Sequence, residues 1–143
     1  MPDESDQLRV RLVTPERTLF EHAASAVELP GKSGYMEVLY GAAPLLTELG
    51  AGEVALHGGP DGPESISRYN VSWGFAEVLP DRVTILASDA LKPEEIDVPR
   101  AQEQLARGHK EWDEAGESEE AYDEALRVIA EAEAKLATAA EKR

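Results

Sequence analysis

The chain of 143 residues contains no cysteine. Disulfide bonds, thiolate nucleophiles and zinc ribbons are therefore excluded, and we expect packing alone to hold the fold together. No stretch approaches the roughly 18 consecutive apolar residues of a membrane span. The N-terminal segment MPDESDQ is acidic, whereas a secretory signal would be basic. These absences predict a soluble protein with no direct membrane span.

Basic residues are also scarce. The chain has 14 lysines and arginines and 29 acidic residues, and its formal net charge is −15. This charge repels phosphate backbones, and no local basic patch is evident in the sequence, so we expect no nucleic-acid partner. A well-solvated surface is the plain interpretation of the acidity. A basic protein partner and a salt-rich cytoplasm are the alternatives.

The first part of the chain, from Leu8 to about Ala87, consists of short apolar runs broken by glycine and proline, a pattern typical of β-strands. In LRVRLV the apolar residues alternate with arginines, which predicts one buried and one solvated face. Turns are expected at 58–63 (GGPDGP) and 79–82 (LPDR). The close spacing predicts an all-β sandwich or barrel. Its expected strands are 8–13, 17–21, 25–29, 35–39, 53–57, 67–79 and 82–87.

After Ser88 the pattern becomes helical. We expect Asp97 to cap a first helix with Pro99 in its opening turn, and Ser118 to cap a second helix that runs to the C-terminus. The segment AGES at 115–118 separates them. Two apolar stripes predict an antiparallel helical hairpin. The stripes are Ala101, Leu105, Gly108, Trp112 and Ala115, and Tyr122, Ala125, Ile129, Ala132, Leu136 and Ala139 or Ala140.

The predicted helix seam is rich in alanine and therefore buries little apolar area. This composition favours a hairpin that can detach and open, and a fixed appendage is the alternative. Gly108 costs about 1 kcal/mol relative to alanine inside a helix, so it indicates either a close helix approach or a weak point.

Motifs of catalysis are missing from the sequence. There is no nucleophile elbow, no Walker loop and no HExxH, and GKSG at 31–34 is interpreted as a turn. His22, His57 and His109 lie far apart in the chain, so we expect no metal site built from them. No spacing of carboxylates singles out an acid–base pair. The sequence therefore argues against an enzyme.

Three segments resemble, in order, a known family. They are GYMEVLYGAAPLLTELGAGEV at 34–54, VSWGFAEVLPDRVTILASDA at 71–90 and IDVPRA at 96–101. They are similar to the patterns G-x-(L/M)-G-V-L-P-G-H-A-P-L-L-T-x-L-x-x-G, V-x-G-G-F-x-E-V-x-x-x-x-V-x-I-L-A and I-D-x-x-R-A. These patterns belong to epsilon subunits of the F-type, proton-translocating ATP synthases. The resemblance covers nearly the whole chain.

The resemblance implies an N-terminal β-sandwich of about ten strands, residues 1–88, that binds the gamma subunit of the central stalk and the c-ring. It also implies a regulatory helical hairpin, residues 89–143, that can extend toward the alpha and beta catalytic subunits and inhibit ATP hydrolysis. The subunit would be a non-catalytic rotor component that couples proton translocation to ATP synthesis. Its expected location is the cytoplasmic face of the bacterial inner membrane, as a peripheral part of the synthase.

One loop departs from the family pattern. Tyr35, Glu37, Tyr40 and Ala42 stand where the family usually has Glu, Gly, Pro and His. In relatives this loop faces the c-ring and gamma, so the resemblance implies contact area from the tyrosines. The alternative is that they fill the rim of the sandwich. The implied interface residues are Tyr35, Glu37, Tyr40, Gly41, Ala42 and Pro44.

In some bacterial relatives the folded hairpin binds ATP, and five matching residues are present: Ile96, Asp97, Arg100, Ala101 and Arg107. Two arginines could bind phosphate oxygens. However, Glu131 and Lys135 stand where those relatives carry arginines, and a glutamate there would repel phosphates.

We therefore expect no cofactor, and favour Asp97 as a helix cap with the arginines paired to acids such as Glu103 or Glu111. An ATP-sensing module whose hairpin is locked by nucleotide, and an unrelated adaptor for a basic partner, remain alternative functions.

Overall fold

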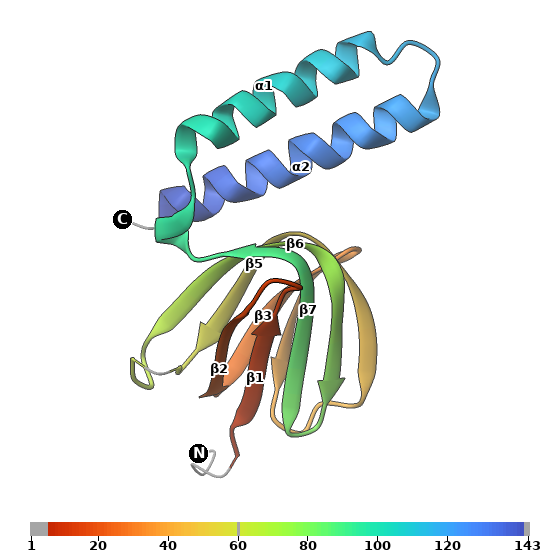
Figure 1. Cartoon of the computed structure of the whole chain (residues 1–143). Helices are drawn as coiled ribbons and strands as arrows, with labels where there is room; N and C mark the ends of the chain where they lie inside the picture. Colours follow the sequence, from red (N-terminus) through yellow and green to blue (C-terminus); the bar gives the residue numbers. More distant parts are fainter. Residues whose placement is uncertain (1–5, 60, 142–143) are drawn as a thin grey trace. The chain divides into compact units, whose positions relative to one another are not determined.

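The computed structural model describes residues 6–59 and 61–141. The chain divides into two compact units, Met1–Leu91 and Lys92–Arg143 (Figure 1). The described part of the first unit is built from strands and that of the second from helices. The last strand continues to Leu91, slightly beyond the boundary after Ser88 that the change of pattern suggested.

Seven strands of the first unit form one sheet in the order β2-β1-β7-β6-β5-β3-β4. Pairing is antiparallel throughout, except that β1 and β7 are parallel. The sheet curves round so that its two parts face each other (Figure 1). The strands are β1 Leu8–Val13, β2 Thr18–Ala24, β3 Ala26–Gly31, β4 Gly34–Leu39, β5 Leu45–His57, β6 Ile66–Leu79 and β7 Arg82–Leu91.

The β-sandwich expected from the sequence is confirmed. Seven continuous strands are found in the described residues, fewer than the ten or so implied by the resemblance. The difference lies in β5, β6 and β7, whose ladder of paired residues is interrupted at Gly50, Trp73 and Ser88. Each of these strands continues through the interruption and is counted as one strand. Each nevertheless provides two paired segments, one on either side of the interruption.

The core of this unit is formed by the inward-facing apolar residues of strands in which apolar and polar residues alternate. Leu8, Val10 and Leu12 of β1 are fully buried, and the arginines between them are exposed, as the period of two predicts. Inward residues of the other strands complete a single cluster between the two layers. Its larger members are Phe20, Val27, Leu29, Leu49, Val54, Leu56, Val71, Val78, Val83 and Ile85.

The second unit contains a short 3-10 turn η1 Pro93–Glu95 and two helices, α1 Val98–Glu114 and α2 Glu119–Glu141. Both predicted caps are confirmed. The Asp97 carboxylate accepts a hydrogen bond from the Arg100 backbone N–H at 3.1 Å, and the Ser118 hydroxyl accepts one from the Ala121 N–H at 3.2 Å. Each cap satisfies a backbone donor that the first helical turn would otherwise leave unpaired.

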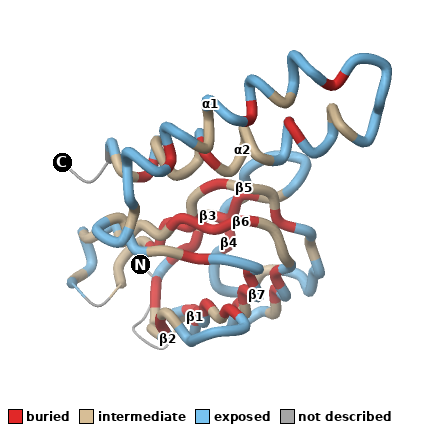
Figure 2. Tube along the Cα trace, turned by 45° about the horizontal axis from the view of Figure 1, so that its top comes forward, coloured by how far each residue is buried: buried red, intermediate tan, exposed pale blue. Residues whose placement is uncertain are grey.

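Small residues line the seam between the two helices. Figure 2 shows buried positions, in red, along both helices. Ala101, Gly108, Ala125 and Ala132 are buried, and the rings of Trp112 and Tyr122 meet edge to face with centroids 4.7 Å apart. A Cβ added at Gly108 would lie 2.7 Å from Ile129 Cγ1. The glycine is therefore explained by close helix approach, one of the two alternatives drawn from the sequence. Thr138, outside the predicted stripe, is also buried.

Across the residues that the structure describes, neither helix is both long and apolar enough to cross a membrane.

Candidate partner-binding surface

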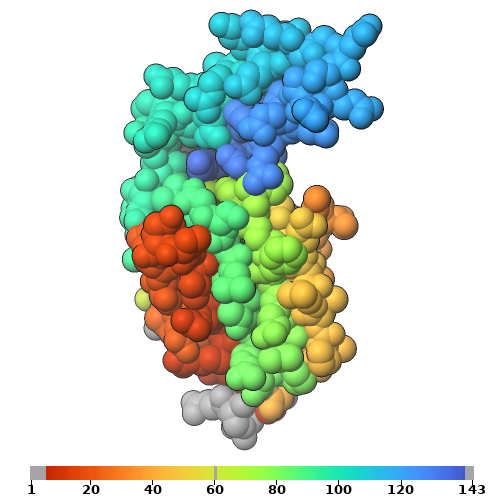
Figure 3. Space-filling view, turned by 45° about the vertical axis from the view of Figure 1, so that its right-hand side comes forward, coloured from red at the N-terminus to blue at the C-terminus, as the bar shows by residue number. Residues whose placement is uncertain are grey.

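The outward side chains of β1, β7 and β6 form one surface, which we name the β1–β7–β6 face. These strands are neighbours in the sheet and lie side by side in Figure 3. Residues at every second position point outward, because those between them are buried in the core. The face consists of Arg9, Arg11 and Val13 of β1, Arg82, Thr84 and Leu86 of β7, and Phe75 and Glu77 of β6.

One end of this face is apolar. Phe75 and Leu86 are directly opposite each other in the β6–β7 ladder and are 52% and 53% exposed. Val13 lies opposite Leu86 on its other side. The three side chains border a hollow of about 400 Å³, lined by Val13, Thr14, Pro15, Gly74, Phe75, Leu86, Ala87 and Ser88. Exposed aromatic and aliphatic side chains around a recess are typical of a protein-binding site.

The backbone next to this hollow is fixed by Trp73 and Gly74, which have positive φ angles of 58° and 126°. A Cβ added at Gly74 would overlap the carbonyl oxygen of Leu86 on β7. Only glycine allows β6 and β7 to approach this closely. The bend at this point therefore depends on a specific residue, and it holds the Phe75 backbone firmly beside the hollow.

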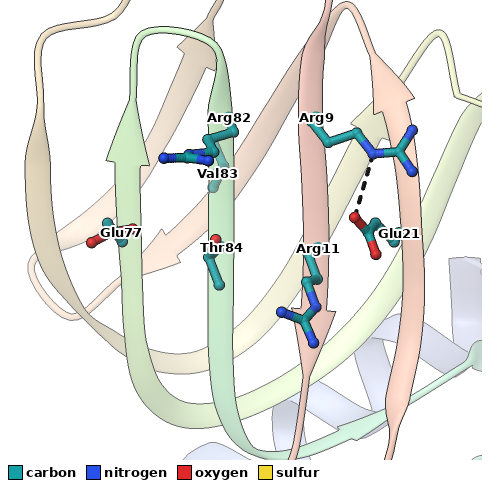
Figure 4. A pocket seen from close by; sticks show the side chains of 7 residues that line it. All are labelled: Arg9, Arg11, Glu21, Glu77, Arg82, Val83 and Thr84. Atoms are coloured by element: carbon teal, nitrogen blue, oxygen red, sulfur yellow. Dashed lines mark hydrogen bonds and ion pairs between the residues drawn. The ribbon is translucent and has the colours of Figure 1, made fainter.

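The other end of the face carries three guanidinium groups (Figure 4). Arg9 Nε lies 3.5 Å from Glu21 Oε1, whereas Arg11 and Arg82 form no ion pair with any residue that the structure describes. They border a hollow of about 370 Å³, lined by Arg9, Arg11, Glu21, Glu77, Arg82, Val83 and Thr84. The sequence showed no basic patch, and the structure adds that parallel pairing of β1 with β7 joins arginines distant in the chain, beside Glu21 and Glu77.

The interface residues implied by the family resemblance lie on β4 and in the β4–β5 loop. Tyr35 is 62% and Tyr40 46% exposed, and the Tyr35 hydroxyl accepts a hydrogen bond from the Glu53 N–H at 3.0 Å. Gly41, with φ 89°, donates its N–H to the Pro80 carbonyl at 2.7 Å. Glu37 and Pro44 are also exposed, and Ala42 is half-buried. These residues do not belong to the β1–β7–β6 face.

Of the five residues matching the ATP-binding pattern, Ile96 and Asp97 immediately precede α1, and Arg100, Ala101 and Arg107 lie within it. Asp97 is occupied as the helix cap, Arg107 Nε lies 3.8 Å from Glu111 Oε1, and Arg100 is exposed. Ile96 is half-buried and Ala101 is buried. The arrangement places Asp97 and Arg107 in the local roles favoured from the sequence, and ATP binding by these residues stays the less favoured alternative.

On α2, the Glu131 carboxylate accepts a hydrogen bond from Gln104 Nε2 at 3.2 Å and lies 3.9 Å from Arg127 Nε. The contact to Gln104 brings this carboxylate to the side of α2 that faces α1. Any phosphate bound between the helices near Gln104 would therefore meet a negative charge.

The sequence analysis missed Phe75 and Leu86 as surface residues. The signal was available, because in GFAEVL and RVTILA these two apolar residues fall at the outward parity of strands whose inward positions are already apolar. An apolar residue on both faces of an antiparallel strand indicates that the outer face is also covered.

Comparisons with known proteins agree with this architecture. A family model described as the beta-sandwich domain of the ATP synthase delta/epsilon chain matches residues 7–93. The ATP synthase epsilon chain of Koribacter versatilis is 43% identical over 114 residues, covering 78% of this chain and 76% of the relative. That of Solibacter usitatus is 40% identical over 139 residues, covering 96% and 98%.

A chain from the mitochondrial ATP synthase of Euglena gracilis, solved with its F1 and c-ring, has a similar fold. The TM-score is 0.78 at 20% identity, with 95% of this chain and 83% of that chain covered. The fold and the matched residues together define a delta/epsilon-type ATP synthase subunit. Within that class the chain belongs to the family of epsilon subunits of the F-type ATP synthase.

Proposed function

We propose that this subunit is a non-catalytic part of the rotor and that its β1–β7–β6 face binds the gamma subunit of the central stalk. The observation that carries the proposal is the pair Phe75 and Leu86, both about half-exposed beside a hollow of about 400 Å³. An apolar recess on a sheet is a rigid surface onto which a partner can dock without ordering flexible segments. The arginines at the other end suit acidic side chains of the partner.

We further propose that the β4–β5 loop contacts the c-ring. Tyr40 is exposed at the start of this loop, and the hydrogen bond from Gly41 to Pro80 ties the loop to the β6–β7 turn. Through its contacts to gamma and the c-ring the subunit would help to couple proton translocation to ATP synthesis. Its place would be the cytoplasmic face of the bacterial inner membrane, attached through these partners.

The helical unit is proposed to restrain ATP hydrolysis by extending toward the alpha and beta subunits. Support comes from its seam, in which alanine and glycine supply much of the buried surface. Because small side chains remove little apolar area from water, such a seam stabilises the hairpin less than leucines would. We propose that this opening is not controlled by bound ATP, since Asp97 acts as a cap and Glu131 lies at the seam.

Co-purification with the cognate gamma subunit tests the docking surface. Phe75→Glu and Leu86→Glu each place a charge in the apolar recess, so we expect gamma binding to weaken by at least about tenfold, as for residues at the centre of an interface. Ile66→Glu is the matched control, since Ile66 is 47% exposed but lies outside the face. Equal binding by all three variants would refute docking at this face.

A further inference from the structure

A cluster of one histidine and two glutamates lies on three neighbouring strands, away from the β1–β7–β6 face. Glu28 is on β3, Glu37 on β4 and His57 on β5. One potential ligand atom from each side chain lies within 4.8 Å of the other two. We propose that these three residues bind a divalent transition-metal ion of the Zn²⁺ type.

Sheet register holds the three side chains together. Glu28 is directly opposite Glu37 in the β3–β4 ladder, and the neighbouring pair Ala26–His57 in the β3–β5 ladder places the histidine beside Glu28. His57 Nε2 is already 2.7 Å from Glu28 Oε1. Zinc binds imidazole nitrogen and carboxylate oxygen at about 2.0–2.2 Å, so small side-chain rotations bring all three onto one ion.

At this position two carboxylates are accompanied by one imidazole, that of His57. Two carboxylates directly opposite each other on paired strands repel and destabilise the pairing. No lysine or arginine in the described parts of the chain forms an ion pair with Glu28 or Glu37. The guanidinium in the same row of the sheet, Arg68, is engaged with Glu53 at 2.8 Å. A divalent ion would neutralise both carboxylates.

The donor set also selects the kind of ion. Calcium and magnesium favour sites made only of oxygen ligands, whereas an imidazole nitrogen favours zinc and its transition-metal neighbours. Three protein ligands leave a fourth position for water. The site is reachable, because the side chains of His57 and Glu28 are 30% and 40% exposed and Glu37 is exposed.

A bound ion would link β4, at the edge of the sheet, to β3 and β5. This edge strand leads directly into the β4–β5 loop that begins at Tyr40. The ion would therefore stabilise the position from which the loop projects. Metal binding depends only on this chain. It can therefore fail while the proposed rotor function holds, and it can succeed while the rotor function fails.

Calorimetric titration of the metal-free full-length chain with Zn²⁺ tests the proposal. We expect one ion per chain, with affinity reduced by more than about tenfold in His57→Asn and in Glu37→Gln, because losing a ligand costs at least as much as losing an outer-shell partner. His109→Asn and Glu48→Gln are the matched controls, each removing an exposed group elsewhere, and should bind as the parent does.

Thermal unfolding supplies a second readout. Zn²⁺ should raise the Tm of the parent chain and of both controls, since a ligand that binds only the folded state stabilises it, and should raise that of Glu37→Gln clearly less at the same Zn²⁺ concentration. Glu37 is exposed, so this variant keeps the test valid even if His57→Asn does not fold. Unchanged zinc affinity in Glu37→Gln, or displacement of Zn²⁺ by an equal concentration of Mg²⁺, would overturn the proposal.

Discussion

Trp73 and Gly74 carry the bend of the longest strand, and both have left-handed backbone angles. Such angles cost a non-glycine residue roughly 1–3 kcal/mol and persist only when the surrounding structure imposes them. Here the imposing contact is visible, since Gly74 lies against the backbone of Leu86. The shape of the β1–β7–β6 face therefore depends on the absence of a side chain at Gly74.

Gly74→Ala should lower the free energy of unfolding by about 3 kcal/mol, since backbone strain and overlap with Leu86 both contribute. Gly34→Ala is the matched control, because Gly34 also has a positive φ, 141°, but a Cβ there meets nothing within 4 Å. It should cost only about 1 kcal/mol of strain. Urea unfolding of both variants measures the difference. Equal losses of unfolding free energy would show that the close approach of Gly74 to β7 adds nothing to the cost of the substitution.

Substitution of Glu131 tests why the helical hairpin is expected not to bind ATP. We expect no saturable binding of ATP to the parent chain up to low millimolar concentrations. Glu131→Arg should make binding measurable, because each unit charge about 4 Å from a phosphate contributes about 1–4 kcal/mol and the substitution changes the charge by two units.

Glu133→Arg, an exposed position on the same helix, is the control for that titration and should remain without detectable binding. Tight ATP binding by the parent chain that is lost in Arg100→Ala would contradict the expectation. It would instead support the ATP-sensing alternative.

Among the elements, those with a clean period could be predicted from the sequence. The alternation of 8–13 and the capped helices from Asp97 and Ser118 appear as expected. The first half of β5 was missed, because the sequence predicted a strand over 53–57 only, whereas β5 spans Leu45–His57. A Cβ at Gly52 would lie 2.6 Å from Pro30 Cβ and 2.7 Å from the Tyr35 hydroxyl, so this glycine permits strand packing.

Candidate sites were harder to predict than elements, because they depend on which strands pair. Glu28, Glu37 and His57 are unremarkable in sequence, and only the β3–β4 and β3–β5 registers bring them together. The arginines of β1 and β7 meet through a parallel pairing of distant strands. Spacing along one strand contains no information about its neighbours, whereas the helix caps depend on local residues only.

For the helical hairpin, Gly108→Leu should separate α1 from α2, since even a Cβ would approach Ile129 within 2.7 Å. We expect an earlier loss of helical signal on heating, although leucine has the higher helix propensity. Ala106→Leu, at an exposed position of α1, should instead leave the melting unchanged or raise it slightly. Circular dichroism at 222 nm follows both, and equal melting would mean that the seam is not closely packed.

At the scale of the whole molecule, the division at Leu91 suggests a subunit with separable tasks. A chain ending after Leu91 retains all seven strands and should still bind gamma. Assembled with the catalytic head, it should allow faster ATP hydrolysis than the full-length chain, because the restraining helices are gone. Comparison of hydrolysis rates at equal subunit occupancy measures this.

The paired control is a full-length chain carrying Ala106→Leu, which keeps both helices. Equal hydrolysis rates with the truncated and full-length chains would contradict an inhibitory role of the second unit. The gamma-binding role of the first unit would be unaffected by that outcome.

The parallel pairing of β1 with β7 also governs how the protein can be made. β1 is complete by Val13, yet its partner begins only at Arg82, so the sheet cannot close until most of the chain has left the ribosome. Contacts of such long sequence separation slow folding, and until then β1 and β2 expose an unpaired edge. During synthesis the second edge of the first strand would be covered only when β7 emerges, which leaves this edge in need of chaperone protection until then.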